Sequence, residues 1–285
     1  NCGHYAHPSS RRPARPFPDW KQVRFFMPFE LAIDPSTLII LAVVAFLAGF
    51  IDAIAGGGGL LTIPALLTAG VPPHLALGTN KLSSTFGAAT ASYTFYRRKL
   101  FHPGKWRNGL LATAIGAAIG AWAAHLLPAE WLNRMLPVVV FTCGLYMLFG
   151  GTPKAPLDAD APLGRKRQWP QGLALGFYDG VAGPGTGAFW TVSSLLMYPL
   201  DLVRASGVAR SMNFVSNIVA LAVFVASGQV IWLLGLCMGA SLMVGAYFGA
   251  RTAIGGGAKF IRPVFILVVL ALTARLAWQH WFSGA

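Results

Sequence analysis

Long apolar segments recur along this chain, and they constrain its fold more than any other feature. They run at roughly 37–55, 60–69, 74–96, 108–127, 131–149, 170–183, 187–199, 202–226, 230–250 and 262–282. Of the 285 residues, 55% are hydrophobic and 11% are charged, whereas a soluble domain carries about 25% charged residues. A lipid-exposed segment must pair its own backbone polar groups, and the alternating short strands typical of a membrane barrel are absent from the sequence. The sequence therefore predicts an all-α, polytopic membrane protein.

The first five segments resemble the last five, which indicates an internal duplication. The stretch "GFIDAIAGGG" at 49–58 aligns with "GFYDGVAGPG" at 176–185, so that Asp52 and Asp179 are equivalent. Aligning "ALGTNKL" at 76–82 with "SGVARS" at 206–211 places Lys81 opposite Arg210. We therefore expect a first transmembrane repeat at 36–150, a basic cytoplasmic linker at 151–169 and a second transmembrane repeat at 170–285.

The net charge of +13 raises the question of a nucleic-acid partner. The basic residues, however, lie mostly in short links between apolar segments, as they do in cytoplasmic loops of membrane proteins. We therefore expect no nucleic acid, and an odd number of crossings in each repeat, which makes the two repeats inverted. The basic, Pro-rich tail at 1–35 contradicts this orientation unless the part before Met27 is foreign to the mature protein.

Two glycine-rich breaks interrupt the apolar pattern at equivalent places. They contain Gly56, Gly57, Gly58 and Gly59 in the first repeat and Gly183, Gly185 and Gly187 in the second. The segments that follow, 60–69 and 187–199, are short for a span, and paired short segments of this kind point to a transporter's substrate site. A half-helix starting near Leu60 or Gly187 would present free N–H groups and a positive dipole end to an anion. The alternative is close helix packing, which we prefer for Gly116 and Gly120.

Asp52 and Asp179 lie deep within apolar segments, where a carboxylate costs on the order of 3 kcal/mol and needs a partner. One interpretation is a relay for a proton or a cation. The other, which we favour, is a cap in which each carboxylate accepts backbone N–H groups of the broken helix.

Lys81 and Arg210 are buried too deeply for their charges to reach the membrane surface easily. They could bind an anion, because a cation beside amide groups gives an oxyanion charge-assisted hydrogen bonds. The alternative is a structural ion pair within each repeat, Lys81 with Asp52 and Arg210 with Asp179. The polar residues near these cations are suited to select an oxyanion or to join helices; they are Thr79, Asn80, Ser83, Ser84, Thr186, Asn213, Ser216 and Asn217.

The sequence contains no nucleophile motif, nucleotide-binding fingerprint or metal-ligand spacing. Its three cysteines, Cys2, Cys143 and Cys237, are far apart. We therefore expect no enzyme activity, no cofactor and no metal site.

The motifs "GFIDAIAGGGGLLTIPALL", "ALGTNKL" and "GFYDGVAGPGTGAF" resemble those of the TauE/SafE sulfite-exporter family over about residues 36–280. The resemblance implies a multi-pass transporter of the bacterial inner membrane that carries small anions such as sulfite, thiosulfate or organosulfonates. By position, the family's glycine motifs fall on the two breaks, and its "TNKL" element falls on residues 79–82. Pro184 replaces one glycine of the repeat, and Arg210 stands where a lysine might be expected.

We therefore predict a carrier that exports a small sulfur oxyanion by alternating access, with proton coupling as an added expectation. Lys81, Arg210, the break glycines and the nearby amides would bind the anion, while Asp52 and Asp179 hold the breaks or carry the proton. The alternative is a cation or amino-acid carrier that uses the two aspartates. The expected partners are a small anion and membrane lipid, and a homo-oligomer is left open.

Overall fold

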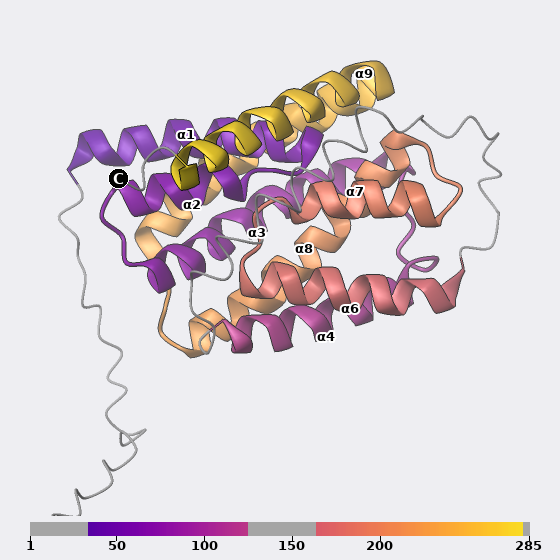
Figure 1. Ribbon diagram of the computed structural model, residues 1–285, viewed down its shortest axis with the longest axis horizontal. Coiled ribbons are helices and arrows are strands. Elements are labelled where there is room, and N and C mark those ends of the chain that lie inside the picture. Colours follow the sequence, from indigo (N-terminus) through magenta and orange to yellow (C-terminus); the bar gives the residue numbers. More distant parts are fainter. Residues whose placement is uncertain (1–33, 125–163, 282–285) are drawn as a thin grey trace, which may run out of the picture. The chain divides into compact units, whose positions relative to one another are not determined.

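The computed structural model describes residues 34–124 and 164–281, which belong to one compact unit that begins at Asp34 (Figure 1). Every regular element in these two ranges is a helix, which confirms the predicted all-α class. The helices are α1 (Pro35–Ala55), α2 (Gly59–Thr68), α3 (Pro73–Arg97), α4 (Arg107–Ala123), α6 (Arg165–Val181), α7 (Thr186–Met197), α8 (Leu202–Ala226) and α9 (Trp232–Trp281). The predicted segment at 131–149 and most of the predicted tail and linker lie outside the described residues.

Three stretches are long and apolar enough to cross a membrane, namely Pro35–Ala55, Leu202–Ala226 and Trp232–Ile261. Their outer faces carry large apolar side chains: Ile39 and Ile40 on α1 and Leu233 on α9 are each more than 60% exposed. On α4, Leu111, Ile115, Ile119 and Trp122 form an exposed apolar stripe. Lipid tails satisfy such surfaces, so the exposed apolar faces agree with a polytopic membrane protein.

The two segments after the glycine breaks form short helices, as the sequence predicts. α2 has 10 residues and α7 has 12, whereas a helix that crosses the hydrocarbon core needs about 20. At 1.5 Å per residue, α2 is only about 15 Å long. Each short helix begins within one residue of its predicted start.

The helices pack in pairs that join distant parts of the sequence. α1 lies along α9, α4 lies along α6, and α3 packs against both α8 and α9 (Figure 1). Close approach depends on glycine: a Cβ on Gly120 of α4 would lie 2.1 Å from the carbonyl oxygen of Phe177 on α6, and one on Gly116 would lie 2.4 Å from that of Leu173. The packing role preferred for these two glycines is therefore correct.

Two helix boundaries differ from the prediction. α6 begins at Arg165, so the end of the predicted linker is helical, because a helix can continue past the edge of its apolar stretch. The predicted segments at 230–250 and 262–282 form the continuous stretch α9, which is interrupted at Gly257, where φ is 59° and ψ is −157°. The sequence predicts two separate segments here, whereas the structure has two helical parts of α9 joined by a kink at Gly257.

α3 and α8 carry the polar interior of the protein. They contribute most of the buried polar and charged side chains, including Asn80, Lys81, Arg210, Asn213 and Asn217. The glycine breaks pack against the same region, so the elements that hold predicted site residues converge.

Candidate functional site

Both glycine-rich breaks turn the chain through left-handed backbone. Gly56, directly after α1, has φ 83° and ψ 45°. In the second half of the sequence, Gly183 and Gly185 have φ values of 85° and 81°. A side chain with a Cβ is strained in this region. Glycine therefore allows the chain to end one helix and begin the next within a few residues.

The two breaks touch each other. The main-chain N–H of Ala188 donates to the carbonyl oxygen of Gly56 at 3.3 Å. A Cβ on Gly56 would lie 2.4 Å from the carbonyl carbon of Gly187, and one on Gly59 would lie 3.5 Å from the Cα of Pro184. The N-terminal ends of α2 and α7 therefore meet at one place, and each contributes the positive end of a helix dipole.

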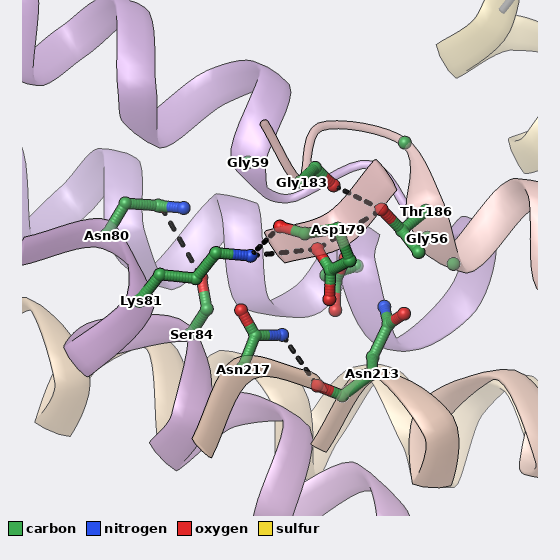
Figure 2. Close-up of a pocket in the computed structure, with 13 residues that line it drawn as sticks. Gly56, Gly59, Asn80, Lys81, Ser84, Asp179, Gly183, Thr186, Asn213 and Asn217 are labelled. Atoms are coloured by element: carbon green, nitrogen blue, oxygen red, sulfur yellow. Dashed lines mark hydrogen bonds and ion pairs between the residues drawn. The ribbon is translucent and has the colours of Figure 1, made fainter. Parts of the chain in front are cut away.

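A small polar cavity lies where these helix ends meet α3 and α8 (Figure 2). The predicted side chains that line it are Asn80, Lys81, Thr186, Asn213 and Asn217. The predicted glycines that line it are Gly56, Gly59, Gly183, Gly185 and Gly187. Asp52 and Asp179 also reach it, as does Ser84. The volume open to the centre of a water molecule is about 20 Å³, which is room for little more than one water.

Three glycines of the cavity wall offer unpaired donors. Among the described residues, the main-chain N–H groups of Gly59, Gly185 and Gly187 have no hydrogen-bond partner. They are the first N–H groups of α2 and α7 or directly precede them, where a helix leaves such groups unsatisfied. Backbone of this kind is tolerated at membrane depth where it is buried in protein or lines a wet cavity.

Lys81 is 1% exposed, and its ammonium lies 2.9 Å from Oδ1 of Asp179. The same ammonium donates to the main-chain carbonyl of Asp179, as Figure 2 shows. An ammonium has three N–H donors, so one remains for another acceptor in the cavity. A Cβ on Gly183 would lie 2.8 Å from this ammonium, so the glycine leaves room for the lysine.

Arg210 is fully buried and does not line the cavity. Its guanidinium donates to the main-chain carbonyl of Asp52 and, at 3.3 Å, to that of Gly187. The carboxylate of Asp52 lies 3.7 Å away, and the Nε of Arg210 has no partner among the described residues. Arg210 therefore joins the end of α1 to the start of α7, and this contact is mostly with main chain.

The ion pairs cross between the two halves, so the alternative of an ion pair within each repeat is wrong. Lys81 pairs with Asp179 rather than Asp52, and Arg210 pairs with Asp52 rather than Asp179. The physical reason is that the two breaks lie side by side, so each cation reaches the break of the other half.

The two aspartates have different surroundings. Oδ1 of Asp52 accepts the main-chain N–H of Gly58 at 2.9 Å, which is the cap geometry that the sequence suggested. Asp179 instead accepts from two hydroxyls, those of Thr186 at 3.2 Å and of Ser216, in addition to Lys81. The side chain of Asp52 is 19% exposed and that of Asp179 only 3%.

The amides are partly committed to other contacts. Oδ1 of Asn80 accepts from the hydroxyl of Thr62, a residue that the sequence did not single out. Nδ2 of Asn217 donates to the main-chain carbonyl of Asn213 at 2.7 Å. Oδ1 of Asn213 is buried and has no partner in the described part of the chain. The sequence signal that could have identified Thr62 is its position about one turn after the first glycine break, on the short helix α2.

Three more of the predicted site residues lie outside the cavity wall. The hydroxyl of Thr79 accepts the main-chain N–H of Ile231 at 3.0 Å, so this residue joins α3 to the start of α9. Gly57 accepts from Leu60, and Gly58 precedes α2 as its N-cap. These residues shape the break and its supports rather than the cavity surface.

The groups that line the cavity are suited to binding an anion. Across the ranges 34–124 and 164–281, no group of three or more His, Cys, Asp and Glu side chains is placed to hold a metal ion. An ammonium, main-chain N–H groups and amides can bind a negatively charged oxygen and leave it unchanged.

Comparison with known proteins gives a consistent set of relatives. The model of the family described as Sulfite exporter TauE/SafE matches residues 41–276. The chain is 40% identical to the probable membrane transporter protein ORF9 of a Sinorhizobium species over 245 residues, which cover 84% of this chain and 92% of the relative. It is 40% identical to a probable membrane transporter protein of Haemophilus influenzae over 89% of this chain and 99% of that one. It is 37% identical to the probable membrane transporter protein YfcA of Escherichia coli, over 88% of this chain and 96% of that protein. No solved structure matches the chain.

Proposed function

This chain belongs to the sulfite exporter TauE/SafE family and is a membrane transporter, and on that premise we propose that it exports small sulfur-containing oxyanions such as sulfite or organosulfonates. It does so by alternating access and resides in a bacterial inner membrane as a multi-pass protein. The bacterial sources of its relatives and the apolar faces of α1, α4 and α9 support this location.

One observation carries the choice of an anion. The cavity brings the ammonium of Lys81 together with the N-terminal ends of two half-helices, whose glycines retain unpaired N–H groups. Each of these groups stabilises negative charge. Three main-chain donors in the cavity wall and a free donor on a buried ammonium match the several oxygens of a sulfite or sulfonate group.

The binding residues in this proposal divide into two sets. The anion oxygens are bound by Lys81, Gly59, Gly185 and Gly187. The side-chain amides nearby set how many hydrogen bonds the anion makes and in which directions. Arg210 does not touch the anion but keeps the two breaks together through the carbonyls of Asp52 and Gly187. This changes the role expected for Arg210, because the cation lies behind the glycines rather than in the cavity.

The size of the cavity supports alternating access. Room for about one water does not accommodate a four- or five-atom anion, so the walls of the cavity must move before an anion can bind. Opening requires the elements around the crossed ion pairs to separate. The equivalent positions of the two breaks support two inverted repeats that exchange roles as the site opens to either side.

A cation or amino-acid carrier is the alternative, and the ion pairs argue against it. Each aspartate that could bind a cation already faces a buried cationic side chain. In the anion carrier, neutralising Lys81 lowers the apparent affinity for the anion and so weakens transport. In a cation carrier the carboxylates are essential and Lys81 is dispensable.

The test is a thermal-shift panel on the purified protein with sulfite, thiosulfate, sulfate, sulfoacetate, taurine and acetate. A ligand that binds only the folded protein stabilises it, by about 2.7 kcal/mol at 100 times its Kd. We expect shifts for thiosulfate and at least one other sulfur oxyanion, and none for acetate. Equal shifts for all six compounds, or none with any, would contradict the proposal.

A further inference from the structure

We propose that anion binding at Lys81 is coupled to the uptake of one proton by Asp179, while Asp52 remains an ionised structural cap. This inference rests on the proposed function and adds to it the residue that carries the coupling proton. The argument uses the charge balance of the cavity and the kind of hydrogen-bond partner that each carboxylate has.

The charges around the cavity already balance. Two cations, Lys81 and Arg210, face two carboxylates, Asp179 and Asp52, in crossed pairs. Lys81, Arg210 and Asp179 are each no more than 2% exposed. An anion that enters therefore brings uncompensated negative charge into a buried site, which is strongly unfavourable. Uptake of a proton by one carboxylate offsets one unit of this added charge.

Lys81 is the cation that an anion can reach, because it lines the cavity and Arg210 does not. Two of its three donors already contact the carboxylate and the carbonyl of Asp179. A bound anion would share this ammonium with the carboxylate, at close range and with little water between them. The entering charge therefore acts most directly on Asp179.

Asp179 can become neutral without leaving a hydrogen bond unsatisfied, because its other partners are hydroxyls that can reverse. The hydroxyl of Ser216 donates to Asp179 but also lies 3.1 Å from the carbonyl of Met212. The hydroxyl of Thr186 has a second acceptor, the carbonyl of Gly183, at 2.7 Å. When Asp179 carries a proton, either hydroxyl can turn to its alternative acceptor and accept the new O–H.

Asp52 lacks this freedom. Its Oδ1 accepts a main-chain N–H from Gly58, and a main-chain N–H can only donate. Its other charged neighbour, Arg210, cannot release a proton in a protein. The side chain of Asp52 is also 19% exposed, whereas that of Asp179 is 3% exposed.

Among the charged groups, Lys81 on α3 pairs with Asp179 and Asp52 on α1 lines the same cavity, while Arg210 on α8 pairs with Asp52. α7 contributes the uncharged Thr186. Since Arg210 keeps its charge, Lys81 binds the anion and Asp52 is held by a fixed donor, Asp179 is the group among these whose protonation can follow the anion.

The proton step involves no covalent change to the anion. A proton from the aqueous phase bonds to an Oδ atom of Asp179 as the anion binds the remaining N–H of Lys81. When the anion leaves, the O–H bond of Asp179 breaks and the proton returns to water. Each cycle therefore moves a proton together with the anion.

The test measures thiosulfate binding by thermal shift and titration at about pH 6 and pH 8, on the full-length protein in detergent. Thiosulfate is chosen because, unlike sulfite, its own charge is constant over this range. If binding takes up one proton, the Kd of the wild type falls by up to about tenfold for each unit that the pH is lowered. We expect Asp179→Asn to bind thiosulfate with the same Kd at both pH values. Asp52→Asn should retain the pH dependence of the wild type.

A second measurement needs no variant. Thiosulfate added to weakly buffered wild-type protein should raise the pH by an amount that corresponds to about one proton taken up per bound anion. Binding of thiosulfate without proton uptake, or an equal pH dependence in Asp179→Asn and wild type, overturns the inference and leaves the proposed function in place. A failure of the wild type to bind thiosulfate at either pH removes both.

Discussion

The ammonium of Lys81 on α3 lies 2.9 Å from the carboxylate of Asp179 on α6, and this buried ion pair joins the two halves of the sequence. In the counterpart pair, the cation Arg210 lies in the second half and the carboxylate of Asp52 lies in the first. The two pairs fix how the glycine breaks lie against each other. Movement of the breaks must therefore change at least one of them.

Removing one member of the Lys81–Asp179 pair should destabilise the protein. Lys81→Ala leaves a buried carboxylate without its cation, which costs about 3–5 kcal/mol. The double variant Lys81→Gln/Asp179→Asn removes both charges and should recover most of this loss. Unfolding in detergent, followed by circular dichroism, measures the difference. Equal stability of the single and double variants would show that the pair is not the dominant interaction.

Arg210→Lys should lower stability more than it lowers anion affinity. The guanidinium bonds two main-chain carbonyls from different breaks, and a lysine ammonium cannot reproduce this fork geometry. Loss of a hydrogen bond to a charged group costs about 1.5–3 kcal/mol. Thermal unfolding and thiosulfate titration of the same variant give the two numbers. A large loss of affinity with unchanged stability would place Arg210 among the anion ligands.

Gly187→Ala should force the two breaks apart. Its Cβ would lie 2.8 Å from the Cα of Gly56 and 2.9 Å from a guanidinium nitrogen of Arg210. Overpacking of this kind costs about 1–3 kcal/mol. Gly104→Ala is the control, because a Cβ there meets no atom within 4 Å. The melting temperatures of the two variants should differ clearly, and matching values would contradict the close contact.

Thr79→Val should reduce stability without affecting anion binding. The hydroxyl of Thr79 accepts the N–H of Ile231, and loss of such a hydrogen bond costs about 1 kcal/mol. Thr79 does not line the cavity, so the Kd for thiosulfate should be unchanged. A weaker Kd in this variant would mean that the wall of the site extends to the start of α9.

The sequence predicted the helical class and the positions of the half-helices because both follow from local signals. Glycine runs disfavour continuation of a helix, and α2 and α7 start within a residue of their predicted positions after the two breaks. The apolar pattern also located the long helices, although it could not show that α6 continues back to Arg165.

The pairing of charges could not be predicted in the same way. Sequence equivalence identifies Lys81 with Arg210 and Asp52 with Asp179, but it does not specify how two similar halves interlock. The partner of each cation depends on the contact between the breaks, such as that of Gly56 with Ala188. For the same reason the sequence placed Arg210 in the site, whereas packing puts it behind the glycines.

The central claim is that the cavity at Lys81 binds a sulfur oxyanion, and counterflow of radiolabelled sulfite in proteoliposomes tests it most directly. Wild-type protein should exchange sulfite saturably, with Thr79→Val as a folded control that behaves like it. The charge-neutral variant Lys81→Gln/Asp179→Asn should fold but lose about 10- to 100-fold in apparent affinity, which corresponds to one charge-assisted hydrogen bond. Unchanged sulfite exchange by this variant would contradict the account.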